Sequence, residues 1–372
     1  MLRTVLIGDA QSPHLLKWAR ALAASAGVEL WVASSRGFAP GFDDLLPRER
    51  RLALNFAAAH AGGSVALLAS LPRLGAWLRR VDADWLHAHY LTSHGTLAWL
   101  AKRLWRLRGR IVGSAWGSDI LLTPLRSPAH RWLTRRVLRA CVLTTSDSRF
   151  MADRMRELGA REVMIFPFGL ESLPPESLPQ ESGPKEPWLF FANRGLEPVY
   201  RPQRVLALFA AVAAVQPQAR LVVANDGSLA RGLPAQARAL GLTVGAVAAG
   251  AQVEFAGQLD SVEQARWYAR ARWFISLPAS DSVSVSVLEA MAHGCIPLLS
   301  ALPANRELVD DNRNGLIVSN TALDVHSLPA LNALFERADE IAQDNRRWVA
   351  QHGMFAPAVA GFLTRLRELS AA

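Results

Sequence analysis

The stretch that decides the fold reads SDSVSVSVLEAMAHG and spans residues 280–294. It follows a short apolar run, residues 273–277, that is typical of a buried strand. Serine is a favoured N-cap, so we expect a helix to begin near Ser282 or Ser284. Gly294 is suited to end that helix, because glycine readily adopts the left-handed conformation found after a helix C-terminus. The sequence therefore predicts a strand, a short loop and a helix.

Two acidic residues flank the start of this helix. Asp281 would lie in the loop above its mouth, and Glu289 about one and a half to two turns inside it. The first N–H groups of a helix lack partners and the helix dipole is positive there, which favours a phosphate. We therefore expect Ser282, Val283 and Ser284 to bind an anion. One carboxylate on each side suits a nucleotide-sugar, with one acid for sugar hydroxyls and one for the ribose.

A second interpretation fits the same residues. The run VSVSV alternates with period two, as a half-buried strand does. Asp281 would then be a simple cap and Glu289 an exposed helix residue. Spacing alone leaves both interpretations open.

The stretch also resembles the signature of the retaining glycosyltransferases of family 4. There an acidic residue, seven intervening residues and Glu are followed by Ala-Met-Ala-x-Gly and a strand that ends in proline. Here Asp281 and Glu289 are followed by AMAHG and then by CIP at 295–297. PANRELV at 303–309 and NGLIV at 314–318 also match the family's ending. The first acid is usually Glu in that family, so Asp281 is one methylene shorter.

Length and composition describe a folded chain of two domains. Of 372 residues, 51% are hydrophobic and 20% charged. The two cysteines, Cys141 and Cys295, imply no disulfide framework and fit a reducing compartment. The N-terminus does not read as a secretory signal, and no apolar run approaches the ~20 residues of a spanning helix. We expect a cytoplasmic protein, or a peripheral one on the inner face of the cell membrane.

The net charge of +9 is concentrated in the first half. Residues 1–170 hold 24 Lys and Arg against 12 Asp and Glu, and residues 171–372 hold 17 against 20. Tryptophans accompany the basic residues in two helix regions, 99–110 and 131–139, which suits an anionic membrane surface. Solvated helix faces would give the same pattern. Nucleic acid is not expected, because no nucleic-acid-binding motif is found.

Apolar runs alternate with amphipathic helical patterns along both halves, which predicts parallel α/β sheets. Strands are expected at 4–8, 29–34, 65–69, 85–90, 110–116, 142–146, 163–168, 188–192, 221–224, 252–256, 272–277 and 296–300. Helices are expected at 13–26, 72–81, 93–107, 128–140 and 149–158.

The domain boundary is marked by a linker rich in Pro, Glu and Ser at 171–187. We expect an N-terminal acceptor-side Rossmann-like domain at 1–170 and a C-terminal nucleotide-sugar-binding domain at 188–355. The resemblance implies the glycosyltransferase-B fold, two doubly wound α/β domains facing a cleft. It also implies that the last helix, within 356–372, packs back on the first domain.

Histidines cluster near the fourth predicted strand. His87 and His89 share one face of it because side chains alternate along a strand, and His94 follows. No Cys or acidic ligand lies nearby, so no metal is expected. The family resemblance favours His89 as a substrate contact rather than a core histidine.

Three further positions take their roles from the resemblance. Trp116 replaces a histidine that many family members place close to the reacting sugar, and Asp119 remains a polar contact or a capping residue. Arg194 matches the family's diphosphate-binding arginine, with Arg201 as the nearest match to its lysine. A surface ion pair of Arg194 with Glu197 is the alternative.

The sequence therefore predicts a retaining, metal-independent glycosyltransferase that uses a nucleotide-diphosphate-sugar as co-substrate and needs no other cofactor. His89 and Asp119 would line the acceptor side. The acceptor would be a glycan or a lipid-linked molecule, in cell-surface polysaccharide or glycolipid assembly. The alternatives are a non-catalytic nucleotide-sugar-binding relative and a nucleotide-sugar epimerase.

Overall fold

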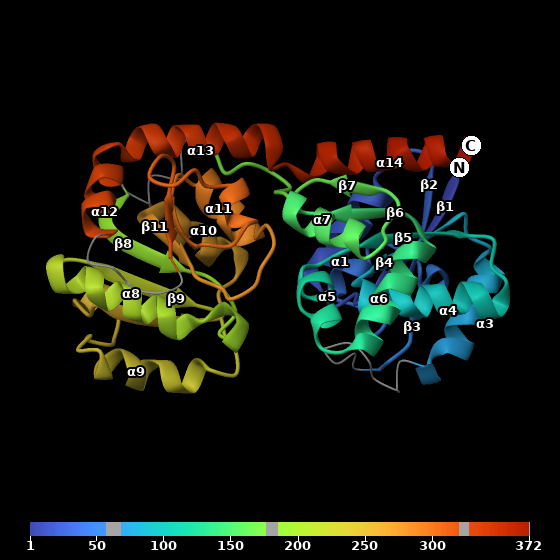
Figure 1. Cartoon of the computed structure of the whole chain (residues 1–372), viewed down its shortest axis with the longest axis horizontal. Helices are drawn as coiled ribbons and strands as arrows, with labels where there is room; N and C mark the ends of the chain where they lie inside the picture. The colour runs from blue at the N-terminus through green and yellow to red at the C-terminus, as the bar shows by residue number, and fades with distance from the viewer. Residues whose placement is uncertain (57–67, 176–184, 320–326, 372) are drawn as a thin grey trace. The chain divides into compact units, whose positions relative to one another are not determined.

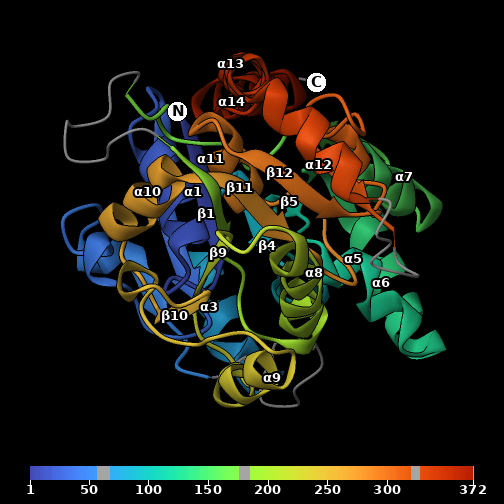
Figure 2. The same ribbon diagram turned by 90° about the vertical axis from the view of Figure 1, so that its left-hand side faces the viewer.

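The computed structural model describes residues 1–56, 68–175, 185–319 and 327–371. Its backbone contacts divide the chain into two compact units (Figure 1, Figure 2). Unit 1 comprises Met1–Phe166 and Ala356–Ala372, and unit 2 comprises Pro167–Phe355. Each unit is an α/β domain built on one parallel sheet.

The sheet of unit 1 has the strand order β3-β2-β1-β4-β5-β6-β7, and every pairing in it is parallel. Because the order reverses between β1 and β4, their carboxyl ends form the switch point at which such sheets bind ligands. The strands are β1 (Leu2–Gly8), β2 (Val28–Ser34), β3 (Arg51–Ala53), β4 (Trp85–His89), β5 (Arg110–Ser114), β6 (Cys141–Ser146) and β7 (Val163–Ile165).

Helices cover both faces of this sheet. They are α1 (Pro13–Ala23), α3 (Leu71–Val81), α4 (Thr96–Trp105), α5 (Ser118–Leu121), α6 (Pro128–Ala140), α7 (Arg149–Glu157) and α14 (Phe355–Ala371), with a π turn, η3, at Leu91–Gly95 and a 3-10 turn, η4, at Thr123–Leu125. On one face, Leu86 and Ala88 of β4 join a core with α3, α4 and α6. On the other, His87 packs against Trp18 of α1 and Phe362 of α14.

The C-terminal helix α14 is fixed to unit 1 by polar contacts as well as by Phe362. Arg365 forms an ion pair with Glu162 at 2.6 Å, and Ser370 accepts a hydrogen bond from the Trp85 indole at 3.1 Å. The chain therefore returns to its first domain at its end.

The sheet of unit 2 repeats the same topology, with the order β10-β9-β8-β11-β12-β13 and parallel pairing throughout. Its switch point lies between β8 and β11. The strands are β8 (Glu186–Ala192), β9 (Arg220–Ala224), β10 (Val253–Gly257), β11 (Ala271–Ser276), β12 (Ile296–Ser300) and β13 (Leu316–Val318). The helices are α8 (Pro202–Val215), α9 (Leu233–Ala239), α10 (Ser261–Arg270), α11 (Val285–Ala292), α12 (Ser327–Glu336) and α13 (Ala338–His352).

Two hydrophobic cores sandwich this second sheet. Successive side chains of a strand point to opposite faces, and Phe190 and Trp273 accordingly join one core while Phe191 and Phe274 join the other. All four are fully buried, which explains why these strands read as continuous apolar runs.

The predicted fold class is confirmed, and most predicted elements occur within a few residues of the predicted bounds. The strand predicted at 65–69 is wrong where the structure describes it: Leu68 and Ala69 are helical, and 65–67 lie outside the described residues. Strand β3 was not predicted. Much of the predicted linker, 176–184, also lies outside the described residues, and the linker's last two residues, at 186–187, belong to β8.

Candidate functional site

The first candidate site lies at the switch point of unit 2. Arg194 follows the end of β8, and the loop after β11 leads through Asp281 into α11. Helix α11 begins at Val285 with Ser284 in the extended N-cap conformation. The helix interpretation of this stretch is therefore correct and the strand interpretation is wrong.

Arg194 is held at the start of α11 by three side chains. Its Nη2 donates to Asp281 Oδ2 at 2.5 Å, and its Nη1 donates to the hydroxyls of Ser284 and, at 3.2 Å, Ser286. The guanidinium also lies over the ring of Tyr200, 4.4 Å from its centre. The Arg194 side chain is 18% exposed, so this cation lies close to the protein surface with a fixed orientation.

One donor of Arg194 is left over. Its Nε–H is buried and has no hydrogen-bond partner among the described residues. Arg194, Tyr200 and Ser276 line a small pocket at the carboxyl ends of β8 and β11. A buried donor without a partner is costly, and an anion within reach would relieve that cost.

The loop before α11 is held by Asp281. Its Oδ1 accepts from the backbone N–H of Ser282 at 3.0 Å. Burial raises the pKa of Asp281 above its usual value, and the neighbouring Arg194 acts in the opposite direction. The side chains of Ser282, Val283 and Ser284 are all buried. Of these three residues, Ser284 places its hydroxyl against Arg194.

Glu289 belongs to a hydrogen-bonded network beneath this loop. Its Oε2 accepts from the hydroxyl of Tyr268 at 3.0 Å, and that hydroxyl also accepts from Asn193 Nδ2 at 3.1 Å. Asn193 in turn accepts from Asn225 at 2.8 Å. Tyr268 is almost fully buried, and burial beside Glu289 raises its pKa well above the usual value. The network fixes the direction of the half-buried Glu289 carboxylate.

Arg201 lies at the N-terminus of α8, with the left-handed backbone φ of 49°. The pKa of Arg204 is lowered, mainly by burial and also by the charge of Arg201, which places the two arginines near each other. Glu197 accepts from the backbone and side chain of Ser228. Among the described ion pairs, that of Arg194 is with Asp281 rather than with Glu197, which was the alternative partner.

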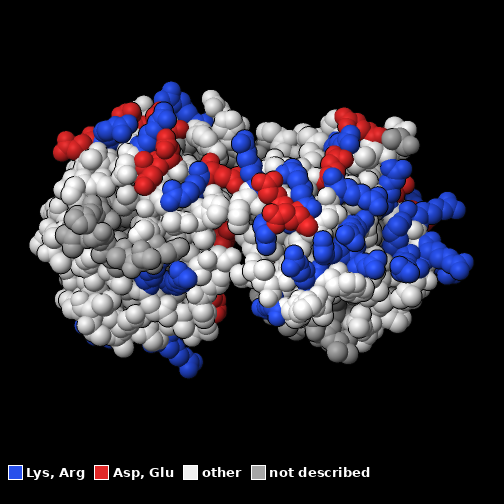
Figure 3. All heavy atoms as spheres, viewed as in Figure 1, with Lys and Arg blue, Asp and Glu red and all other residues white. Residues whose placement is uncertain are grey.

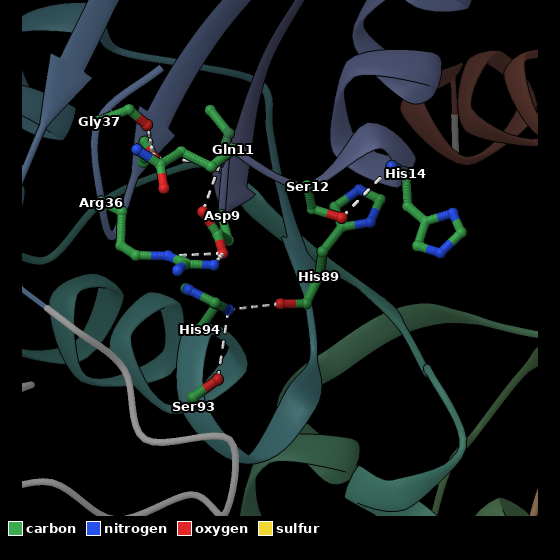
Figure 4. A network of polar contacts seen from close by, with 11 residues as sticks. Asp9, Gln11, Ser12, His14, Arg36, Gly37, His89, Ser93 and His94 are labelled. Carbon is green, nitrogen blue, oxygen red and sulfur yellow. Dashed lines mark hydrogen bonds and ion pairs between the residues drawn. The ribbon is translucent and has the colours of Figure 1, made fainter. Parts of the chain in front are cut away.

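The second candidate site is the switch point of unit 1, which Figure 4 shows from close by. His89 is 4% exposed, and neither of its ring nitrogens has a hydrogen-bond partner among the described residues. Burial lowers its pKa well below the usual value, helped by His87, His94 and His14. His94 donates through its Nδ1–H to the carbonyl of His89, 2.7 Å away. Burial also lowers the pKa of His87 to about 3 and that of His94 to about 4, so this cluster is neutral.

Charged and aromatic groups border these histidines. Arg36, after β2, forms an ion pair with Asp9, after β1, with an Nε–Oδ2 distance of 2.9 Å (Figure 4). Trp116 lies 5.0 Å from the ring of His14 and 5.8 Å from that of His89, centre to centre. Trp116 therefore forms part of an aromatic wall beside the histidine cluster.

Asp119 lies inside unit 1 rather than on its surface. It is 0% exposed, and its two oxygens accept from the backbone N–H groups of Leu91, at 2.7 Å, and Trp116, at 2.9 Å. Burial raises its pKa to about 6, while these hydrogen bonds lower it. Asp119 thus fixes the loops after β4 and β5, which corresponds to the capping alternative.

Several residues at these edges were missed in the sequence. Tyr200, Tyr268, Asn193 and Ser286 come from four separate elements, so no spacing pattern links them. Asn193 directly follows an apolar strand and precedes Arg194. A polar residue at the carboxyl end of a strand is the one sequence signal that could have indicated a site residue here. Within the described ranges, no group of three or more His, Cys, Asp or Glu could hold a metal ion.

Two family models match the chain. The model described as "Glycosyl transferase 4-like" matches residues 3–148, and "Glycosyl transferases group 1" matches residues 175–346. Together they cover most of both units. No curated protein matches the chain.

Solved structures share the fold along the whole chain at low sequence identity. Sucrose-phosphate synthase from Thermosynechococcus elongatus is 14% identical, with a TM-score of 0.77 and 100% of each chain covered. HepE from Anabaena, solved with UDP-glucose, is 14% identical with a TM-score of 0.70, covering 98% of this chain and 100% of that one. A glycosyltransferase from Rickettsia africae is 11% identical, with a TM-score of 0.73 over 99% and 98% of the two chains.

Proposed function

Because the chain belongs to the group 1 glycosyltransferases with the glycosyltransferase-B fold, we propose that it moves a sugar from a nucleoside-diphosphate-sugar to a glycan or lipid-linked acceptor. The observation that carries this proposal is the placement of Arg194. A single guanidinium is oriented by Asp281 and two serine hydroxyls at the first turn of α11.

The donor would bind at the switch point of unit 2. Arg194 and Arg201 hold the diphosphate, since guanidinium groups stay charged and match phosphate oxygens in geometry. The first N–H groups of α11 add to this anion site, and Asp281 contacts the sugar. Glu289, oriented by Tyr268, accepts hydrogen bonds from the ribose hydroxyls. The uridine diphosphate and UDP-glucose in HepE complexes support a nucleoside-diphosphate-sugar as donor.

The reaction would retain the anomeric configuration by front-face displacement. The bond between the sugar C1 and the phosphate oxygen breaks, and an acceptor oxygen bonds to C1 on the same face. The acceptor's proton passes to an oxygen of the departing diphosphate. Arg194 and Arg201 stabilise the charge that grows on the leaving group, which is the role of preorganised cations in a transition state, and no metal takes part.

The acceptor would meet the switch point of unit 1. His89 offers two ring nitrogens that have no hydrogen-bond partner among the described residues, and its neutral form can donate a hydrogen bond to an acceptor hydroxyl or accept one from it. Trp116 offers an apolar wall beside it. Asp119 would not contact the acceptor itself but would hold the loops after β4 and β5 in place through the N–H groups of Leu91 and Trp116. We place the reaction in cell-surface polysaccharide or glycolipid assembly, on the cytoplasmic side.

A panel of nucleotide-sugars tests the proposal. We expect one class of donor to raise the melting temperature, and mass spectrometry to find the sugar on an added glycan or lipid-linked acceptor after incubation with EDTA present. Donor binding without any transfer would favour a non-catalytic relative instead. Conversion of the donor's sugar without an acceptor would favour an epimerase.

A further inference from the structure

The outer face of α4, η4 and α6 in unit 1 carries many cations and almost no acidic residue. Residues 85–146 contain ten Lys and Arg and one acid, Asp119, which is fully buried. Helix α3, which packs beside α4, adds three arginines and no acid. Figure 3 shows Lys and Arg side chains gathered over α4 and α6.

Not all of these cations are available to a partner. Lys102 donates to the carbonyls of Leu107, Arg108 and Gly109 and so closes the end of α4. Arg110 donates to the Leu369 carbonyl of α14. Those two charges stabilise the fold, so the cations left for a partner are the exposed arginines of α4, of the turn after it and of α6.

Three of the four arginines on α6 point outward. Arg131, Arg136 and Arg139 are exposed, and none of them forms an ion pair with any described residue. On a helix without acids, uncompensated arginines repel one another, so this surface is held at an energetic cost that an anionic partner would remove.

Large apolar side chains are exposed among these cations. Leu104 of α4 is 62% exposed, Leu125 of η4 is 68% exposed and Trp132 of α6 is 53% exposed. The Trp132 ring lies under Arg136, 5.3 Å from its guanidinium carbon, and makes an edge contact with Trp99 at 6.5 Å. An amphipathic indole flanked by arginines is suited to the headgroup level of a bilayer.

We propose that this face, defined by Leu125, Arg131, Trp132, Arg136 and Arg139, docks unit 1 on an anionic lipid bilayer. The arginines would contact lipid phosphates, and Trp132 and Leu125 would enter the interface. The argument for lipid is the combination of charge with exposed apolar groups, since a soluble polyanion needs only the charge. No helix in the described ranges is long and apolar enough to span a membrane, so the contact would be peripheral. The proposal does not depend on sugar transfer.

Sedimentation of the full chain with vesicles tests this contact. Vesicles of phosphatidylcholine mixed with phosphatidylglycerol should bring the protein down at low salt, and phosphatidylcholine alone should not. Binding should weaken steeply with salt because the Debye length shortens from about 30 Å at 0.01 M to about 8 Å at 0.15 M. Changing Arg131, Arg136 and Arg139 together to Gln should weaken binding on the order of a hundredfold, about fivefold per charge.

Two further variants decide what kind of partner the face fits. The control changes three exposed arginines of unit 2 to Gln, namely Arg231, Arg238 and Arg266. It removes the same amount of charge outside the proposed face and should leave vesicle binding almost unchanged. Leu125→Ser with Trp132→Ser should weaken vesicle binding about tenfold without weakening binding to heparin. Wild-type protein that stays in solution at low salt overturns the proposal. So does a serine variant that binds vesicles as the wild type does, which would indicate a soluble polyanion.

Discussion

Each unit places one Arg–Asp pair at the switch point of its sheet, but the two pairs have different surroundings. In unit 1, Arg36 meets Asp9, and its side chain is 42% exposed. In unit 2, Arg194 meets Asp281, and its side chain is 18% exposed. Arg194 also contacts two hydroxyls and an aromatic ring. The fold supplies both positions, and in unit 2 two hydroxyls and an aromatic ring orient the arginine in addition to its aspartate.

The neighbouring titratable groups differ in the same direction. The edge of unit 1 is dominated by buried histidines that burial keeps neutral. The edge of unit 2 presents Glu289, held by Tyr268, about one turn into α11. One topology thus gives an edge lined by neutral histidines and aromatic rings, which we propose for the acceptor, and an edge with an oriented arginine and a carboxylate, which we propose for the nucleotide.

The sharpest way to test the difference is to remove the oriented cation. Arg194→Ala should lower kcat by about 100- to 1000-fold, because charge on the leaving diphosphate is greatest in the transition state. The donor KM should rise much less. Steady-state kinetics with the donor found in the panel measures both parameters.

The control is Arg194→Lys, which keeps the charge and loses the forked geometry, and should recover part of kcat. A rise in KM with kcat unchanged would show that Arg194 binds only the ground state. Asp281 loses its partner in the alanine variant, so circular dichroism must first show that the variant is folded.

The neutral histidines of unit 1 predict acid sensitivity. The pKa values of His87 and His94 are lowered from about 6.5 to about 3 and about 4, so only the unfolded chain takes up their protons between these values. Stability should therefore fall below pH 6.5 by about 1.4 kcal/mol per pH unit for each histidine. Asp119 acts in the opposite direction. Because its pKa is raised to about 6, the folded chain takes up its proton before the unfolded chain does, and below pH 6 this offsets the effect of one histidine.

His94→Asn isolates one of these groups. Asparagine can still donate to the His89 carbonyl, but it does not titrate. The loss of unfolding free energy between pH 6 and pH 5, measured with urea, should shrink by about 1.4 kcal/mol. An unchanged pH dependence would mean that His94 does not stay neutral in the folded protein.

A smaller effect is expected from the carboxylate inside α11. Glu289→Ala should weaken nucleoside-diphosphate binding by about 1–3 kcal/mol, the loss of a charge-assisted hydrogen bond. Calorimetric titration measures this loss of affinity. A companion variant, Tyr268→Phe, keeps the Glu289 carboxylate but removes the hydrogen bond that orients it. Full affinity in a folded Glu289→Ala variant would exclude the ribose role.

The smallest effect concerns the ring beneath Arg194. Tyr200→Leu removes the cation–π contact and keeps an apolar wall for the pocket. Such contacts are worth about 0.5–2 kcal/mol, so diphosphate affinity should fall by about 2- to 30-fold. A Tyr200→Phe variant keeps the ring and should bind as the wild type does.

The sequence predicted the elements that carry strong local signals. The bounds of α6 were predicted correctly because Ser127 caps it and Pro128 opens it. Ser284 was among the two expected N-caps of α11, although the alternating valines favoured a strand. Strand β3 was missed because it has three residues and no apolar alternation. Short edge strands are defined by their neighbours, which a single sequence does not show.

Site residues divide in a similar way. Asp281 and Glu289 were predicted from one spaced motif and Arg194 from a separate family resemblance, and the structure brings all three to the same edge of unit 2. The polar partners Asn193, Tyr268 and Asn225 could not be found, since they meet only after β8, β9 and α10 pack together. The burial of Asp119 was also not readable, because it depends on two loops closing over it.

One measurement tests most directly whether unit 2 holds the donor nucleotide. Calorimetric titration with uridine diphosphate compares two matched variants, Arg194→Gln and Arg36→Gln, each of which removes the arginine of one Arg–Asp pair. We predict that Arg194→Gln weakens binding at least about tenfold, since a hydrogen bond to a charged group is worth about 1.5–3 kcal/mol, and that Arg36→Gln leaves it unchanged. Equal losses in both variants, or a loss in Arg36→Gln alone, would contradict the account.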